Sequence, residues 1–463
     1  MTSKFASSFV GGRERAPLII AGILSALAYL YLALHSGQYG EASLTQLLSV
    51  CAACLLVQGI VFYLVMTDRL ELNWLDLLFF AVLFRLIGVT AYPVLEDDFF
   101  RYLWDGWVSV TTGSPYGVPP SDFFAQDDLS DRWSDILDGI NYPDVPTVYG
   151  PTAQWLFELS YHIAPGQVWP LQILAAAADI GVILVLRLLV PLRWLFLYAW
   201  SPLLVKEFAF TAHFDVLGVF FLVLGLFLRT RQISRPDQIW VNIAVGILVG
   251  LACGIKIFAL LAAPFLLQID WRGWLSFLLT IVLIAIPFGF VAAWLPDGLY
   301  VMGSDWLFNA PIYISAGALF GWESLTTIKI VCVVLFAGLA ATLFLKRCGR
   351  DLLPLTQTLR STTPKTEPEH YLSALTLLFG CLLFVLPVFN PWYLVWWLAF
   401  AALRPSITAW TCSVVVLLSY ITGINTGDPG LQLYEQPIWV WYLEFGAIGI
   451  ALLADGHRVI RLA

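Results

Sequence analysis

Three consecutive carboxylates, Glu96, Asp97 and Asp98, follow an apolar run and precede the sequence FFRYLWDG. A carboxylate at the edge of hydrocarbon is costly to desolvate, and neighbouring like charges raise one another's pKa. Both effects suit a general base that accepts a proton from a reacting hydroxyl. We expect Asp98 to be this base and Asp97 to be the second candidate, because Glu96 precedes the expected helix and can reach solvent. Asp97 and Asp98 could instead hold a divalent metal, Mg²⁺ or Mn²⁺.

The residues that follow share one face if 99–107 form a helix. Asp98, Arg101, Tyr102 and Asp105 then lie at i, i+3, i+4 and i+7. Such an amphipathic helix would lie along the membrane surface and hold a carboxylate near the lipid headgroups. Arg101 is a candidate cation for a phosphate, and Tyr102 and Asp105 are candidates for substrate binding. A simple stripe of ion pairs is the alternative.

Two proline-rich segments, SPYGVPP (114–120) and NYPDVPTVYGPTAQ (141–154), flank the rest of the acidic stretch. Proline fixes its own backbone and restricts the residue before it, so both segments should be stiff and extended. Either they only cross the surface, or they form a preformed wall around a substrate. In the second case Tyr116, Tyr142 and Tyr149 supply sugar-stacking faces or hydroxyl partners.

Further charged residues lie within or at the ends of apolar runs. His213 and Asp215 are two residues apart in SPLLVKEFAFTAHFD, and Lys256 lies in GIKIFALLAAPFLL. We expect His213 and Lys256 to bind a donor phosphate and Asp215 to contact substrate. The alternatives are a structural histidine and a lysine that reaches the headgroups. Lys206 and Glu207 can neutralise each other.

The composition indicates what must position these residues. Of the 463 residues, 60% are hydrophobic and only 12% are charged, whereas a soluble domain has about 25% charged residues. The chain is therefore predicted to be a single polytopic, all-α membrane domain over 1–463, with roughly 11–14 spans of about 20 apolar residues each. The expected spans are 17–35, 43–66, 74–93, 168–190, 193–210, 213–229, 239–255, 274–295, 324–345, 371–389, 407–424 and 437–454, with shorter runs at 151–164, 257–269 and 391–403.

Charge predicts the orientation of these spans. Basic residues near Arg69, Arg229–Arg235, Arg272, Lys346–Arg350 and the C-terminus fit cytoplasmic loops. The loop 94–146 holds eleven Asp and Glu against two Arg, so it should face outside the cytoplasm. Residues 347–370 are expected to form a cytoplasmic connector. The short loops favour a bacterial cytoplasmic (inner) membrane.

Several function classes lack their motifs. The sequence has no Walker loop, no GxGxxG after a strand, no HExxH and no Cys/His cluster. A net charge of −8 argues against nucleic-acid partners.

Taken together, DDFFRYLWDG, GSPYGVPP, NYPDVPTVYGPTAQ, SPLLVKEFAFTAHFD, GIKIFALLAAPFL and NPWYLVWW resemble the motif series of the GT-C superfamily of glycosyltransferases. Within it the chain is most similar to bacterial multi-pass mannosyltransferases that use polyprenyl-phosphate sugars, although Gly150 stands where these proteins more often have proline. The resemblance implies a catalytic first outer loop carrying short amphipathic helices. It also implies that an acid four residues before a tyrosine, here Asp98 before Tyr102, deprotonates the acceptor.

The resemblance thus implies an inverting glycosyltransferase. It would move a hexose, with mannose the first choice, from a polyprenyl phosphate to a lipid-linked or cell-envelope glycan at the outer face. A flippase or transporter of lipid-linked or small anionic substrates is the main alternative, but it would place charges near mid-membrane on broken helices. A membrane acyltransferase is a weaker one, since it rests on His213 alone.

Overall fold

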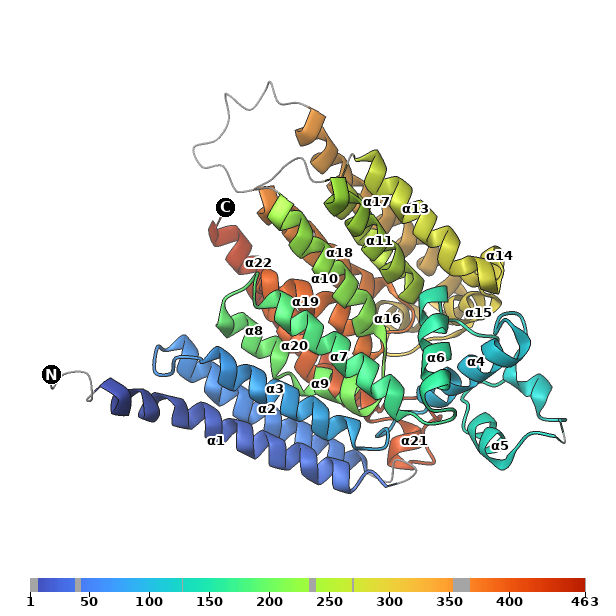
Figure 1. Ribbon diagram of the computed structural model, residues 1–463, viewed down its shortest axis with the longest axis horizontal. Helices are drawn as coiled ribbons and strands as arrows, with labels where there is room; N and C mark the ends of the chain where they lie inside the picture. Colours follow the sequence, from blue (N-terminus) through green and yellow to red (C-terminus); the bar gives the residue numbers. More distant parts are fainter. Residues whose placement is uncertain are drawn as a thin grey trace.

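The computed structural model describes residues 7–37, 43–126, 128–232, 239–268, 270–352 and 367–462. Within these ranges the chain forms helices and no strand; Phe308 and Val388 make one isolated bridge. The long helices form a tilted bundle (Figure 1). The predicted all-α membrane fold is confirmed.

Six described helices, or seven if a bent pair counts as one span, are long and apolar enough to cross a membrane. The others that the sequence suggested are shorter, at 10–17 residues. The predicted span 193–210 is wrong as a continuous helix. Pro191 precedes one helix, which ends at Ala199, and Pro202 starts the next. The six are α1 (Ser7–Leu34), α2 (Leu44–Met66), α7 (Trp169–Leu186), α13 (Trp271–Ala285) with η4 (Ile286–Phe288), α17 (Leu325–Leu352) with η5 (Trp322–Ser324), and α22 (Ile438–Leu462).

The broken span bends by 115° at residues 211–214. It consists of α9 (Pro202–Val205), the π-helical turn η2 (Lys206–Phe210) and, after the bend, α10 (Asp215–Gln232). Single π-turns often mark functional sites because they redirect side chains. This one delivers His213 and Asp215 to the end of the bundle.

Other helices of the described residues accompany these spans. They are α3 (Trp74–Val89), α8 (Leu192–Ala199), α11 (Ile239–Ile255), η3 (Ile257–Ala262), α12 (Ala263–Leu267), α14 (Phe290–Trp294), α15 (Asp297–Asp305), α16 (Pro311–Phe320), α18 (Glu367–Val385), η7 (Pro391–Leu394), α19 (Val395–Leu403), α20 (Ile407–Val415), η8 (Val416–Tyr420) and α21 (Gly423–Thr426).

A glycine at every fourth position lets α11 pack closely on its neighbours. A Cβ at Gly246 would lie 2.0 Å from Ser276 Oγ on α13, and one at Gly254 would lie 2.1 Å from Thr152 Oγ1. Small residues at this spacing bring membrane helices into close contact. The carbonyl of Gly254 in turn fills the space where Gly150 would carry a Cβ, at 2.4 Å. A residue with a Cβ at position 150 would therefore clash with this carbonyl, and the contact fixes the end of α11 that leads into Lys256.

The acidic segment, residues 94–146, and the helix that follows it fold outside the main bundle as four short helices. They are α4 (Asp98–Thr112), η1 (Pro120–Phe123), α5 (Asp131–Asp138) and α6 (Pro151–Ile163). The helix predicted over 99–107 exists and is longer. Its polar face, however, is buried in protein rather than laid on a membrane surface, since Arg101, Tyr102 and Asp105 are all nearly inaccessible.

The acidic segment lies at the opposite end of the bundle from the chain ends. Figure 1 shows the start of α1 and the end of α22 on one side, and α4, α5, α6, α15 and α21 on the other. Of the predicted connector 347–370, residues 353–366 lie outside the described ranges.

Candidate functional site

The acidic segment faces a cavity of about 1750 Å³ at this end of the bundle. Part of its wall comes from the start of α4, the 141–150 loop and the residues around Lys256, between α11 and η3. Most of the rest comes from residues 293–309, the start of η7 and residues 419–441. The predicted site residues that line it are Asp97, Asp98, Arg101, Tyr102, Tyr142, Tyr149, Asp215 and Lys256.

Asp97 and Asp98 are held together at the first turn of α4. Asp97 is the N-cap residue and Asp98 begins the helix, whose N-terminus favours negative charge. The side-chain amide of Asn141 donates to Oδ1 of both residues, at 2.6 Å to Asp97 and 3.1 Å to Asp98. One donor therefore serves two adjacent carboxylates, and the like charges remain close.

The two carboxyl groups titrate differently. Burial, with the negative charges of Asp98 and Glu96, raises the pKa of Asp97 to about 7. Burial alone would also raise the pKa of Asp98, but the imidazole of His213 and the amide of Asn141 outweigh it and lower that pKa. At neutral pH Asp98 is ionised, whereas Asp97 is poised between its two forms.

His213 lies behind Asp98 and does not line the cavity. Its Nε2 is 3.8 Å from Asp98 Oδ2, its Nδ1 is 3.1 Å from Glu207 Oε2, and its ring stacks on Trp392 at 3.8 Å between centroids. Trp392, which lines the cavity, and Glu207 thus hold the imidazole in place. This geometry suits orienting Asp98 more directly than contacting a bound phosphate.

Lys256 supplies a cation to the cavity. Its Nζ lies 3.0 Å from Asp215 Oδ1 and 3.6 Å from the centroid of the Tyr393 ring. The indole of Trp396 donates to the same Asp215 oxygen at 2.8 Å. Asp215 is therefore occupied by two donors, while one fifth of the Lys256 side chain remains accessible.

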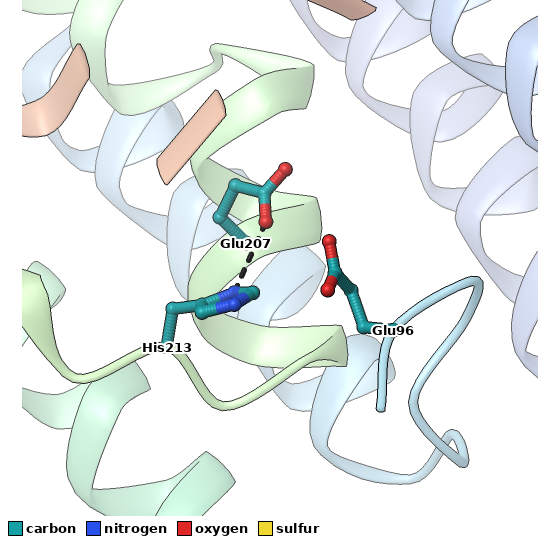
Figure 2. A group of neighbouring side chains, drawn as sticks. All are labelled: Glu96, Glu207 and His213. Atoms are coloured by element: carbon teal, nitrogen blue, oxygen red, sulfur yellow. Dashed lines mark ion pairs between the residues drawn. The ribbon is translucent and has the colours of Figure 1, made fainter. Parts of the chain in front are cut away.

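A second charged cluster lies beside the acids. Glu96, Glu207 and His213 come from the α4 entry loop, η2 and the bend, and their potential ligand atoms lie within 4.8 Å of one another (Figure 2). Such a trio could hold a metal ion. Lys206 already supplies the compensating charge, however, because its Nζ is 3.3 Å from Glu96 and 3.4 Å from Glu207.

The hydroxyl of Tyr420 closes this cluster, donating to Glu96 Oε1 or to Glu207 Oε1, which lie 2.7 Å and 2.8 Å away, and accepting from Lys206. The expectation that Glu96 reaches solvent is therefore wrong, since its side chain is 10% exposed and paired. The Lys206 ammonium therefore occupies the position that a metal ion would need in this cluster. Metal binding at Asp97 and Asp98 stays a prediction.

Arg101 and Asp105 form a closed pair further along α4. Arg101 donates to Asp105 Oδ1 at 2.8 Å and to the carbonyl of Val145 at 2.9 Å. The other Asp105 oxygen accepts from Thr147 at 2.5 Å and from Gln154 at 3.1 Å. Asp105 thus lies behind the cavity wall, and Arg101 forms part of that wall with its guanidinium already paired.

The tyrosines divide between wall and interior. Tyr102 directs its hydroxyl toward Asp98 Oδ2 at 3.5 Å, and Tyr149 packs edge-on against the Tyr102 ring. Tyr116 lies outside the cavity and donates to the Tyr149 carbonyl at 2.8 Å. The sequence prediction missed Asn141, because an amide in a proline-rich loop carries no signal, and Tyr420, because it lies in an apolar run far along the chain.

Comparison with known protein families gives a match. A family model described as alpha-(1->6)-mannopyranosyltransferase, N-terminal domain (MptA_B), matches residues 31–272. No curated protein and no solved structure matches the chain. Every candidate site residue predicted from the sequence falls within the matched stretch, whereas the opposite wall of the cavity comes from residues beyond it.

Proposed function

Because the chain belongs to the family of alpha-(1->6)-mannopyranosyltransferases, we propose that it takes mannose from a polyprenyl-phosphate donor and passes it, with inversion, to a glycolipid or glycan acceptor outside the cytoplasm. Membership makes the chain a mannosyl-transferring glycosyltransferase of the membrane, which excludes the transporter and acyltransferase alternatives. The donor, the stereochemistry, the acceptor and the side of the membrane are the parts we propose.

One observation carries the proposal: two adjacent acids, Asp97 and Asp98, and a cation, Lys256, line the same cavity at the end of a helical bundle. An ionised Asp98 can accept the proton of an acceptor hydroxyl while the hydroxyl oxygen bonds to C1 of the sugar. The C1–O bond to phosphate breaks as the new bond forms, and the polyprenyl phosphate leaves with the electron pair. A single displacement of this kind inverts the configuration at C1.

Lys256 has the position to stabilise the leaving phosphate. It is the cation least enclosed among the proposed phosphate ligands, since Arg101 is nine-tenths buried and paired and His213 lies behind the wall. A fixed positive charge is most effective where charge develops in the transition state. Arg101 and His213 then support the wall and Asp98.

An apolar groove beside Lys256 suits a polyprenyl chain. The groove has a volume of about 420 Å³, is lined by apolar side chains, and shares Ile257, Phe258 and Leu386 with the main cavity. A donor whose phosphate meets Lys256 could lay its hydrocarbon in this groove. A nucleotide sugar would gain nothing there.

The test is transfer by the purified full chain in detergent or nanodiscs. We expect radiolabelled mannose to move from polyprenyl-phosphate mannose to α-mannoside acceptors, and NMR of the product to show inversion at C1. GDP-mannose, the control donor, should give no product. Transfer from GDP-mannose alone would overturn the donor assignment, and retention at C1 would overturn the single displacement.

Orientation is tested separately, in a variant lacking the seven native cysteines. The many acids of 94–146 lead us to place this segment outside the cytoplasmic membrane of a bacterium. Asp128→Cys on the exposed part of the segment should react with an impermeant thiol reagent in intact cells. Labelling that requires permeabilised cells would contradict this placement.

A further inference from the structure

Three aromatic rings from distant parts of the chain meet on the cavity wall. Tyr142 lies 4.4 Å from Trp306 and 5.7 Å from Tyr434, centroid to centroid, with interplanar angles of 35° and 26°. All three line the cavity, and Tyr142 and Tyr434 are 41% and 36% exposed. We call these three residues the aromatic platform.

The backbone holds Tyr142 in an unfavourable conformation. Its φ is +48°, a region that residues with a Cβ rarely adopt, and its carbonyl accepts from the Val145 amide at 3.0 Å. Strain of this kind persists where surrounding structure enforces it, and it is concentrated at functional sites. The consequence here is that a large ring remains on the cavity wall instead of packing into the core.

The platform adjoins the catalytic acids. Tyr142 follows Asn141, whose amide binds both Asp97 and Asp98. Burial and the charges of Asp97 and Asp98 raise the pKa of Tyr142, as expected for a phenol close to those carboxylates. A molecule resting on the platform would therefore lie beside the proposed base.

Resting on the proposed function, we propose that the aromatic platform binds the acceptor as a neutral pyranose saccharide. The C–H-bearing face of a pyranose is apolar and slightly positive, so it packs on the negative face of an aromatic ring. Neighbouring lining residues Asn425, Gln432 and Glu435 offer hydrogen-bonding groups for the sugar hydroxyls.

The alternative occupant, the anionic donor, fits the platform poorly. The charged residue that lines the cavity next to Tyr434 is an acid, Glu435, and Asp97 lies on the other side of Asn141. A phosphate placed there would meet negative charge, whereas Lys256 and the apolar groove lie elsewhere on the wall. Trp306 and Tyr434 also lie beyond residues 31–272, so two of the three rings come from the part of the chain that the family match does not include.

The experiment measures saccharide binding and transfer on the full chain. The probes are the methyl glycosides of α-1,6-mannobiose and α-1,6-mannotetraose, with binding followed by saturation-transfer NMR without donor. The variants are Trp306→Ala, Tyr434→Ala and Tyr142→Gly, the last because glycine accepts the positive φ and leaves the backbone in place. Tyr434→Phe retains the ring, and Tyr300→Ala and Tyr442→Ala remove exposed tyrosines that do not line the cavity.

We expect each platform variant to raise the dissociation constant and the acceptor KM roughly threefold to tenfold. The donor KM should not change, and Tyr434→Phe and the two control variants should match the wild type. Wild-type binding that the three variants leave unaltered would overturn the proposal, as would failure of the wild type to bind either saccharide. Because binding is measured without donor, an error in the proposed donor would abolish transfer and leave this binding result intact.

Discussion

Helix α4 carries two acidic centres built from the same residue types, and they differ in how fully their oxygens are paired. Asp105, on the third turn, has three donors, and its side chain is 3% exposed. Asp97 and Asp98, on the first turn, share one short amide donor, Asn141. Asp98 has longer contacts besides, with the Tyr102 hydroxyl at 3.5 Å and His213 Nε2 at 3.8 Å, and it is 21% exposed to the cavity. Charge alone therefore does not distinguish a structural acid from a reactive one; the supply of short hydrogen bonds and the exposure to the cavity do.

The same distinction applies to the cations. The guanidinium of Arg101 is engaged by Asp105 and the Val145 carbonyl. Arg85 is likewise paired with Asp179, at 2.7 Å, in the core between α3 and α7. Lys256 also has a carboxylate partner, but it retains an accessible side. A buried ion pair adds little net stability, but removing one partner is costly. We call Arg101 and Asp105 the closed centre, and Asp97, Asp98 and Lys256 the open centre. We expect substitutions at the closed centre to affect folding and those at the open centre to affect the rate of transfer.

The largest effect should come from Asp98→Asn, which keeps shape and removes basicity. Transfer should fall by about 10²–10⁴-fold with folding and donor binding intact, since that is the usual contribution of a general base. The measurement is single-turnover transfer of labelled mannose, with Asp138→Asn on exposed α5 as the matched control. If Asp97→Asn is inactive and Asp98→Asn active, the base is the neighbouring residue. If both are active, the open centre is not the catalytic one.

Lys256→Met should give the next largest effect. Loss of a cation that stabilises the leaving phosphate costs about 10²–10³-fold in rate. The single variant also leaves Asp215 buried without its ion-pair partner, so the double variant Lys256→Met/Asp215→Asn separates the two effects. The double variant should recover the melting temperature and not the rate. Recovery of both would assign Lys256 a structural role only.

How much of this comparison the sequence could predict depends on the range of each contact. The periodicity of residues 98–105 predicts a helix with one polar face, and that face exists. Residues from outside the helix decide which acid on this face is fully hydrogen-bonded. Thr147 and Gln154 donate to Asp105, whereas the cavity adjoins Asp98. Local spacing cannot reveal partners more than 40 residues away.

The bundle shows the same limit. Hydropathy predicts an all-α membrane chain because every apolar run must satisfy its backbone internally. It overestimated continuous spans, since runs such as 193–210 are mostly apolar but are divided by Pro202 and the π-turn. Tyr142 was foreseen as a sugar-stacking residue, but its companions Trp306 and Tyr434 lie more than 160 residues further along the chain.

Arg101→Met tests the closed centre. Removing one partner of a buried pair should lower the free energy of unfolding by about 3–5 kcal/mol. Transfer per folded molecule should change much less than in Lys256→Met. The readouts are thermal unfolding in detergent and the rate normalised to folded protein, with Arg132→Met on exposed α5 as control. A stable Arg101→Met protein that has lost transfer would move Arg101 into the open centre as a phosphate ligand.

The smallest effect is the pH dependence that separates the two acids of the open centre. If ionised Asp97, with a pKa of about 7, is required, the rate should rise up to tenfold per pH unit below 7 and level off above it. If Asp98 alone is the base, its lowered pKa leaves the rate flat between pH 6 and 8. Steady-state transfer across this range decides between them.

Stability provides an independent check on the same group. The pKa of Asp97 is higher in the folded chain than its usual 3.8, so the folded state binds the proton more tightly than the unfolded state between about pH 4 and 7. The free energy of unfolding should therefore fall as pH rises through this window, by at most about 1.4 kcal/mol per unit. Asp97→Asn should flatten that slope, and Asp138→Asn should not. An unchanged slope in Asp97→Asn would mean that Asp97 ionises at its ordinary pKa, and Asp98 would then be the sole candidate base.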